Sequence, residues 1–120
     1  MGLHMIVRIY HNPRCSKSRA TKALLESKEI EFEVVEYLKV PLNSAILTQL
    51  LKKLGLSAAS LLRTNEAEFK QSGIDLDNTC EETLVELMVE MPKLIERPIV
   101  ETDNAARIGR PPEQVLELFK

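Results

Sequence analysis

Hydrophobic residues lie along this chain in the short runs and spacings of a protein built from both strands and helices. Met5–Tyr10 is an apolar, β-branched run, and Glu31–Tyr37 is a second segment rich in β-branched and aromatic residues. Both predict strands. Residues 16–27 carry apolar side chains at helical spacing and predict a helix between them. A strand, helix and strand in succession form a right-handed unit, so we expect the two strands to be parallel.

The pattern then changes to a helical one. Pro41 breaks the extended segment, and Asn43 or Ser44 is a suitable N-terminal cap for a helix. Leucine and isoleucine recur at spacings of three and four after this point, which predicts an apolar stripe facing a core. Gly55 is expected to end this helix in the left-handed conformation.

Three further helical segments are expected at residues 57–62, 66–71 and 80–90. Thr79 or Asp77 is the expected cap of the last one, and Thr79 and Glu82 have the spacing of a capping box. The middle of the chain, about residues 42–91, is therefore predicted to form a mostly helical insertion.

The C-terminal part returns to strands. Pro92 ends the last insertion helix, Arg97–Val100 is expected to form a third strand, and Ala106–Ile108 a short fourth one. Pro111 and Pro112 then open a terminal helix, because proline is well tolerated in a first turn. The predicted order is strand, helix, strand, the insertion, strand, strand, helix.

Composition narrows the class of protein. A chain of 120 residues fits a single domain spanning residues 1–120, and 44% hydrophobic and 28% charged residues are ordinary for a globular protein. A net charge of −2 and the absence of Trp give no reason to expect nucleic acid binding. No apolar run approaches the roughly 18 residues of a membrane span, and no signal peptide is expected. Residues 1–4 precede Met5, and no function is expected of His4.

The two cysteines, Cys15 and Cys80, lie far apart and form no CxxC pair. A disulfide framework is therefore not expected, and a reducing compartment such as the cytoplasm fits better. Cys80 falls at the start of a predicted helix. It is a conceivable resolving thiol, but the neighbouring Glu81 and Glu82 are expected to raise its pKa, which favours an inert role.

Cys15 has the more reactive setting. It lies in the loop His11–Arg19, between the first strand and the first helix, where unpaired backbone N–H groups and the helix dipole leave partial positive charge. Arg14, Lys17 and Arg19 add cations, His11 is a candidate for one further positive charge, and the loop contains no acid. The pKa of Cys15 is therefore expected to fall from about 8.5 into the range of about 3.5–7.5. The same donors would also bind an anion.

A buried, inert role is the usual alternative for a lone cysteine. The charged and hydroxylated neighbours of Cys15 favour a reactive one. Thiol activation alone adds little, because the roughly 25-fold gain in thiolate fraction from a two-unit drop in pKa is offset by roughly 8-fold lower nucleophilicity. An anionic substrate would need further positive charge, so arginines from elsewhere in the chain are expected at the site.

Four motifs carry a family resemblance. Asn12–Arg19 resembles the active-site motif of the glutaredoxin-coupled arsenate reductases, and most closely that of a bacterial branch whose substrate is unproven. Three further segments match motifs of this family in the same order: Leu61–Glu66, Glu96–Val100 and Arg107–Glu113. The likeness runs from about Ile6 to Phe119. The resemblance implies an α/β, thioredoxin-like fold. Its mixed four-stranded sheet would carry the helical insertion between a βαβ and a ββα half.

The resemblance also implies the site. Arg63, Arg97 and Arg110 occupy the positions of the oxyanion-binding arginines, and a guanidinium fork suits a tetrahedral anion. Arg107 lies three residues before Arg110, and only the motif favours one over the other. Pro98 matches the cis proline that begins the third strand of such folds.

The implied reaction is arsenic detoxification, in which arsenate is reduced to arsenite. Cys15 attacks arsenic to form a thiol–arsenate adduct, while His11 and Ser18 stabilise the thiolate through hydrogen bonds. Glutathione attacks the adduct, and the partner glutaredoxin resolves the mixed disulfide, since no second thiol stands at position 18. No metal and no bound cofactor are implied.

Of three alternatives to arsenate reduction, one stays open and two are disfavoured. The open one is a glutathione-linked oxidoreductase that acts on another substrate, such as a mixed disulfide. A polymerase-binding regulator of the same fold senses oxidation through a CxxC pair, which Cys15 and Ser18 do not supply. A low-molecular-weight phosphatase needs a C-x₅-R loop, and neither Arg19 nor Arg63 has that spacing from Cys15.

Overall fold

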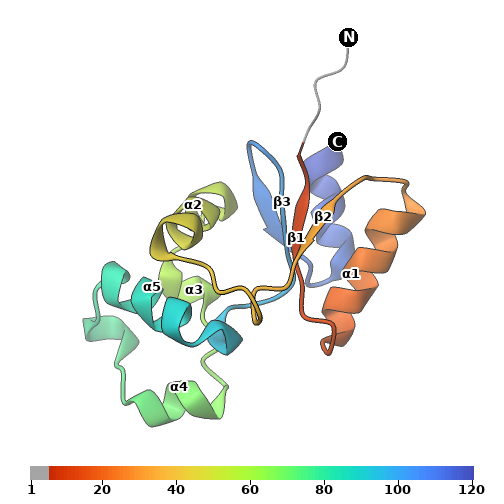
Figure 1. Cartoon of the computed structure of the whole chain (residues 1–120). Coiled ribbons are helices and arrows are strands. Elements are labelled where there is room, and N and C mark those ends of the chain that lie inside the picture. The colour runs from red at the N-terminus through yellow and green to blue at the C-terminus, as the bar shows by residue number, and fades with distance from the viewer. Residues whose placement is uncertain (1–5) are drawn as a thin grey trace. The chain divides into compact units, whose positions relative to one another are not determined.

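The computed structural model describes residues 6–120, which divide into two compact units (Figure 1). The described part of the first unit is residues 6–40 together with Arg97–Lys120, and the second is Pro41–Glu96. The second unit contains the insertion predicted at about residues 42–91. Met5, the first residue of the predicted first strand, and residues 1–4 lie outside the described residues.

The first unit is built on a mixed four-stranded sheet with the strand order β2-β1-β3-β4. β1 pairs in parallel with β2 and antiparallel with β3, and β3 pairs antiparallel with β4. The predicted mixed sheet and its parallel first pair are both confirmed. The elements of this unit are β1 (Arg8–Tyr10), α1 (Ser16–Ser27), β2 (Glu33–Val35), β3 (Ile99–Glu101), β4 (Ala106–Ile108) and the 3-10 helix η3 (Pro112–Phe119).

One face of this sheet is covered by α1 and η3 (Figure 1). Alternation along β1 directs Ile9 to this face, where it is fully buried in a cluster with Leu25 of α1, Val100 of β3 and Val115 of η3. This apolar contact holds the last turns of α1 against the sheet. The terminal helix is a 3-10 helix from Pro112, where the sequence predicted a helix of unspecified type.

The side chains of β1 that point to the other face of the sheet carry polar groups. Tyr10 donates its hydroxyl hydrogen to Oε1 of Glu101 on β3 at 2.7 Å, and the Arg8 guanidinium lies 3.9 Å from the same oxygen. Burial, followed by the hydrogen bond and the charge of Glu101, raises the pKa of Tyr10 far above its ordinary range. The buried Glu101 carboxylate is thereby partnered across two strands.

α1 ends without a glycine. Lys28 closes the helix with its N–H directed at the carbonyls of Leu24 and Leu25, and Glu29 then adopts a left-handed φ of 57°. Glu29 takes the place that glycine most often fills after a helix. The predicted bounds of the helix, residues 16–27, are confirmed.

The second unit is helical. Asn43, one of the two predicted caps, accepts a hydrogen bond from the N–H of Ile46 at 2.8 Å at the start of α2. Gly55 ends the helix with a φ of 69°, as predicted. The apolar stripe of this helix, including Leu47 and Leu50, is buried. The elements are α2 (Ser44–Leu54), α3 (Ala58–Leu61), α4 (Ala67–Ser72), η1 (Leu76–Asn78), α5 (Glu81–Glu90) and η2 (Pro92–Leu94).

The predicted cap of α5 is wrong. Cys80 is the N-cap, and the hydroxyl of Thr79 donates instead to the carbonyl oxygen of Asp75 at 2.6 Å. Asp77 does not cap α5 either, because it lies inside the short helix η1 and Cys80 holds the N-cap position. The side chain of Asp75 therefore starts the short helix η1, and the hydroxyl of Thr79 closes its end instead of capping α5.

Candidate active site

Cys15 lies at the N-cap of α1 with extended backbone angles, φ −93° and ψ 124°. Its N–H donates to the carbonyl oxygen of Asn12 at 3.0 Å, and the Asn12 side chain accepts the N–H of Arg14 at 3.0 Å. Pro13 stands inside this turn. Strand, tight turn and helix therefore place the thiol at the first N–H groups of a helix, as the sequence predicted.

The surroundings of the sulfur lower its pKa. Partial burial raises the pKa of Cys15, but the backbone N–H of Ser18, the Arg97 guanidinium and the backbone N–H of Lys17 act in the opposite direction and outweigh burial. The net pKa lies below the ordinary cysteine value. The thiolate is thus stabilised by helix N–H groups and by one distant arginine, as expected for a helix N-terminus.

Arg110 lies beside the same sulfur. Its Nη2 is 3.5 Å from Sγ of Cys15, and its Nε donates to the carbonyl oxygen of Arg97 at 2.7 Å. The Arg97–Pro98 peptide bond is cis, as the resemblance implied, and Arg110–Pro111 is a second cis bond that the sequence did not indicate. The first unit therefore brings Arg97 and Arg110 together at Cys15.

Sequence spacing alone did not decide whether Arg107 or Arg110 belongs to the site, and the structure distinguishes them. Arg107 lies on β4 and donates through Nη1 to the carbonyl oxygen of Ala106 at 2.8 Å. It lines a separate open pocket with Pro111 and Glu117. Of the two arginines, Arg110 is the one in contact with the thiol.

His11 and Ser18 are joined beneath the loop. Nδ1 of His11 lies 2.6 Å from Oγ of Ser18, and the same hydroxyl accepts the N–H of Asn12 at 3.0 Å. Both side chains are buried, His11 at 6% and Ser18 at 0% exposure. These bonds fix the turn that carries Cys15, while the contact of Ser18 with the sulfur comes from its backbone N–H. Direct stabilisation of the thiolate by the two side chains stays a prediction.

The surroundings of His11 favour its neutral form. Burial first, and then the charges of Lys22 and Arg19, lower its pKa, against an opposing effect of Glu36. The sequence had suggested His11 as one further positive charge near Cys15. Arg19, another expected cation, directs its Nη1 to the carbonyl oxygen of Pro13 at 2.9 Å. This hydrogen bond stabilises the turn that carries Cys15 from its exposed side.

Two residues of the site were missed at the level of sequence. Gly109, just before Arg110, is packed so closely that an added Cβ would lie against Oγ1 of Thr21 and 2.9 Å from Cγ of Pro98. Thr21 is fully buried on α1 and donates to the carbonyl oxygen of Lys17 at 2.8 Å. Gly109 also donates its N–H to the Pro98 carbonyl at 2.9 Å. A glycine adjoining a motif arginine was the available signal.

Arg63, the third predicted arginine, belongs to the helical unit. It follows α3, its N–H donates to the Leu94 carbonyl at 2.7 Å, and its Nη1 lies 2.6 Å from Oε1 of Glu96. Its Nε lies 3.5 Å from a carboxylate oxygen of Glu66. Two carboxylates of its own unit therefore face the guanidinium, and its role in binding an anion with Cys15 stays a prediction.

Cys80 is also in the helical unit and is exposed. The expectation that Cys80 has a raised pKa is wrong: the charge of Glu82 does raise the pKa, but other groups lower it by more. Its Sγ lies 3.0 Å from Oγ1 of Thr83, and this hydroxyl together with the N–H groups of Thr83 and Glu82 lowers the pKa despite the opposing charge of Glu82. The hydroxyl of Thr83 has the largest effect, and the position of Cys80 as the N-cap of α5 adds unpaired N–H groups beside the sulfur.

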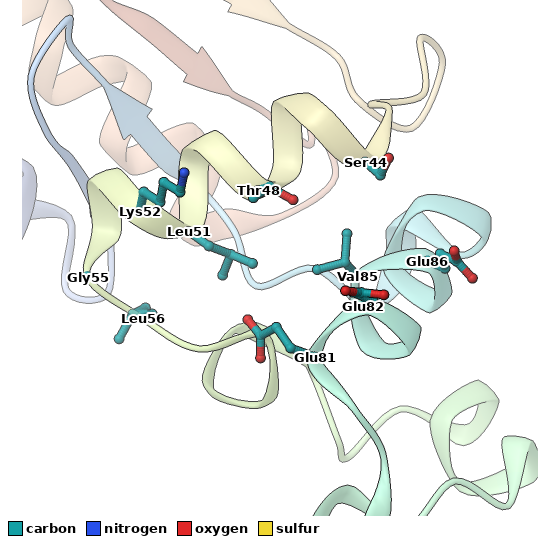
Figure 2. A pocket seen from close by; sticks show the side chains of 10 residues that line it. All are labelled: Ser44, Thr48, Leu51, Lys52, Gly55, Leu56, Glu81, Glu82, Val85 and Glu86. Atoms are coloured by element: carbon teal, nitrogen blue, oxygen red, sulfur yellow. The ribbon is translucent and has the colours of Figure 1, made fainter.

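The helical unit contains a cavity of about 520 Å³ between α2 and α5, none of whose lining residues the sequence analysis had placed in a site. Figure 2 shows Leu51 of α2 and Val85 of α5 extending toward each other across it. A second cavity, of about 450 Å³, lies in the first unit beside the turn that carries Cys15. The second cavity is lined by His11, Asn12, Pro13, Arg14, Glu36, Leu38 and Lys39.

Residues 6–120 contain no group of three or more His, Cys, Asp or Glu side chains arranged to hold a metal ion. Within the same range no helix has the length and apolar character needed to cross a membrane.

Comparison with known proteins gives one consistent result. Residues 10–118 match the ArsC family. The chain is 53% identical over 113 residues to the uncharacterized protein YfgD of Escherichia coli K12, covering 93% of this chain and 95% of that protein. It is 42% identical over 110 residues to an arsenate reductase of Neisseria meningitidis MC58, covering 91% and 94% of the two chains.

A solved structure agrees with these matches. The arsenate reductase from Vibrio cholerae superposes with a TM-score of 0.91 at 46% sequence identity, covering 94% of this chain and 97% of that one. Fold and sequence therefore point to the same relatives over nearly the whole chain.

Proposed function

The chain belongs to the ArsC family, whose thioredoxin-like fold it shares, and on that premise we propose that it reduces arsenate, or a similar oxyanion, with Cys15 as the nucleophile. The observation that carries this proposal is the placement of Arg97 and Arg110 at the sulfur of Cys15, with Arg110 Nη2 at 3.5 Å. Two guanidinium groups beside a thiolate favour an anionic substrate over a neutral one.

The residues of the first unit supply distinct parts of this reaction. The N–H groups of Lys17 and Ser18 hold negative charge on the sulfur, and Arg97 adds a full positive charge. An arsenate ion approaching the thiolate would otherwise be repelled by it. The Arg110 guanidinium, anchored by its Nε to the Arg97 carbonyl, is positioned to bind oxygens of that ion. We propose that Arg63 contributes a third guanidinium.

The first chemical step joins sulfur to arsenic. The Cys15 thiolate attacks As(V), an As–S bond forms, and one oxygen leaves arsenic as water after protonation. Arsenic is still pentavalent in this thiol–arsenate adduct. The arginines remain paired with its other oxygens, where negative charge is concentrated in the transition state.

Reduction then requires a second thiol. Glutathione attacks the adduct, the electron pair of the As–S bond passes to arsenic, and arsenite is released as a disulfide forms between Cys15 and glutathione. Two thiols are oxidised to one disulfide while As(V) becomes As(III). Position 18 holds serine, so we propose that glutaredoxin reduces the mixed disulfide and restores Cys15. Both cysteines are free, which fits the reducing cytoplasm as the place of action.

The test is arsenite formation. Purified protein with glutathione and glutaredoxin is expected to convert arsenate to arsenite catalytically, and Cys15→Ser is expected to abolish turnover. Cys80→Ser serves as the matched cysteine variant and is expected to retain turnover. Absence of arsenite at high protein concentration, with the thiol of Cys15 still titratable, would contradict the proposal.

A further inference from the structure

The cavity beside the turn of Cys15 has an unusual arrangement of charge. Its walls are His11–Arg14 on one side and Glu36, Leu38 and Lys39 on the other, enclosing about 450 Å³. This volume falls within the range of about 300–1,000 Å³ typical of small-molecule sites. Arg14 and Lys39 contribute two cations, and Glu36 contributes one carboxylate.

These charges are available for exchange with a ligand. Lys39 pairs with Glu36 at 3.5 Å, but the side chains are 78% and 37% exposed, so the pair is a weak surface interaction. Arg14 is exposed, and its guanidinium makes no hydrogen bond or ion pair with any residue in the described range 6–120. A ligand carrying both signs of charge can therefore take these side chains without breaking a buried network.

We propose that this cavity binds the reducing thiol as a small zwitterionic thiol peptide with two carboxylates and one ammonium group, the charge set of glutathione. Arg14 and Lys39 face the carboxylates, and Glu36 faces the ammonium. Leu38 and Pro13, which also line the cavity, pack against the aliphatic parts of the peptide.

The position of the cavity suits the reaction. Asn12, which lines the cavity, accepts the N–H of Cys15 at its carbonyl oxygen at 3.0 Å. The cavity and the thiol therefore belong to the same tight turn. Arg97 and Arg110 approach the sulfur from another segment, after the third strand begins. In this proposal the oxyanion and the reducing thiol have separate binding residues, Arg97 and Arg110 for the first and the cavity beside the turn of Cys15 for the second.

This inference rests on the proposed function, which requires a thiol co-substrate, but its test does not use arsenate. In a Cys80→Ser background, Cys15 thiolate attacks one sulfur of oxidised glutathione. A disulfide between Cys15 and glutathione forms, and the other glutathione leaves as a thiolate. The rate is followed by mass spectrometry, with 2-hydroxyethyl disulfide as an uncharged comparison reagent.

Arg14→Gln and Lys39→Gln are expected to slow the reaction with oxidised glutathione by about three- to tenfold each, since each removes one charge-assisted contact. Their rates with 2-hydroxyethyl disulfide are expected to stay within about twofold of the parent, because that reagent carries no charge for either side chain to bind. Lys28→Gln is the matched control, because it removes an exposed lysine at the other end of α1, roughly 18 Å away. It is expected to change neither rate.

Equal slowing with both reagents would mean that Arg14 and Lys39 act only on the thiolate, and it would overturn the proposal. Unchanged rates with both reagents would also overturn it. Binding of S-methylglutathione to a Cys15→Ser variant, followed by NMR shifts of residues 11–14 and 36–39, gives a second readout without chemistry. Failure of arsenate turnover alone, with this selectivity intact, would refute the proposed substrate and leave the thiol site standing.

Discussion

Nη2 of Arg110 lies 3.5 Å from Sγ of Cys15, although the two residues are 95 positions apart in the sequence. The same guanidinium donates through Nε to the carbonyl oxygen of Arg97, whose own side chain lowers the pKa of the thiol. The two arginines are thus linked to each other as well as to the sulfur. Substituting either arginine should therefore change the reactivity of the Cys15 thiol even in the absence of substrate.

Arg97→Gln is expected to raise the pKa of Cys15, because it removes a cation that favours the thiolate. The measurement is the pH dependence of iodoacetamide alkylation of Cys15 in a Cys80→Ser background. Lys28→Gln removes a cation from the far end of α1 and is expected to leave the midpoint unchanged. An unshifted midpoint in Arg97→Gln would show that the N–H groups of α1 act alone.

Gly109→Ala is expected to lower the free energy of unfolding by about 1–3 kcal/mol and to reduce activity, because the added methyl group meets Thr21 and the ring of Pro98. Neither neighbour is a flexible chain end that can move aside. Thermal unfolding and arsenate turnover measure the two effects.

Gly55→Ala is the matched control for that variant. Its Cβ would meet nothing within 4 Å, but the residue has a φ of 69°. We expect about 1 kcal/mol of destabilisation from the left-handed backbone and unchanged turnover. If Gly109→Ala kept full turnover, the close packing behind Pro98 would not matter for the site.

His11 is expected to make stability fall as the pH decreases below about 6.5. Its pKa in the folded protein is lowered from an ordinary value of 6.5, so the unfolded chain takes up a proton that the folded protein does not. Well above pH 6.5 both states are neutral at this residue and the effect vanishes. Between pH 7 and pH 5, His11→Asn should therefore lose less unfolding free energy than the parent.

The chain has one other histidine, His4, and His4→Asn is the control for that titration. It is expected to retain the parent's loss of stability between pH 7 and pH 5. Denaturant unfolding at the two pH values measures both variants. Identical pH dependence of His11→Asn and the parent would contradict a neutral, buried His11.

Arg63→Ala is expected to raise the KM for arsenate by about tenfold or more, with a smaller change in kcat, if its guanidinium binds the anion. The reaction of Cys15 with an uncharged disulfide should be unaffected, which separates an oxyanion reductase from a disulfide reductase. Glu96→Gln is the companion variant, because Glu96 pairs with Arg63 at 2.6 Å. It removes the ion pair but keeps the arginine, so a rise in KM confined to Arg63→Ala identifies anion binding.

Local patterns predicted most of this fold. The bounds of α1, the cap at Asn43, the left-handed Gly55 and the fourth strand all follow from short-range rules on periodicity, capping and proline. The cap of α5 was wrong because Asp75 offers the backbone a competing turn, and the two options differ by only a few contacts.

The reactive cysteine of the site was predictable from the sequence, but the geometry around it was not. Cys15 followed from local charge, whereas the positions of Arg97 and Arg110 depend on pairing among β1, β3 and β4 that no local pattern encodes. The neutral state of His11 and the close packing of Gly109 arise from burial, and burial is a property of the packed structure. The lowered pKa of Cys80 was not predictable in the same way, because the sequence shows its acidic neighbours but not that the Thr83 hydroxyl and helix N–H groups lie against the sulfur.

The central claim is that Cys15 is a thiolate whose neighbouring arginines bind an incoming oxyanion. It is tested most directly by the rate of Cys15 alkylation across pH, with and without arsenate, in the Cys80→Ser protein and its Arg110→Ala variant. We predict a midpoint below the ordinary cysteine value, and slowing of the reaction by arsenate that Arg110→Ala abolishes. A midpoint at or above about 8.5, with a rate indifferent to arsenate, would contradict the account.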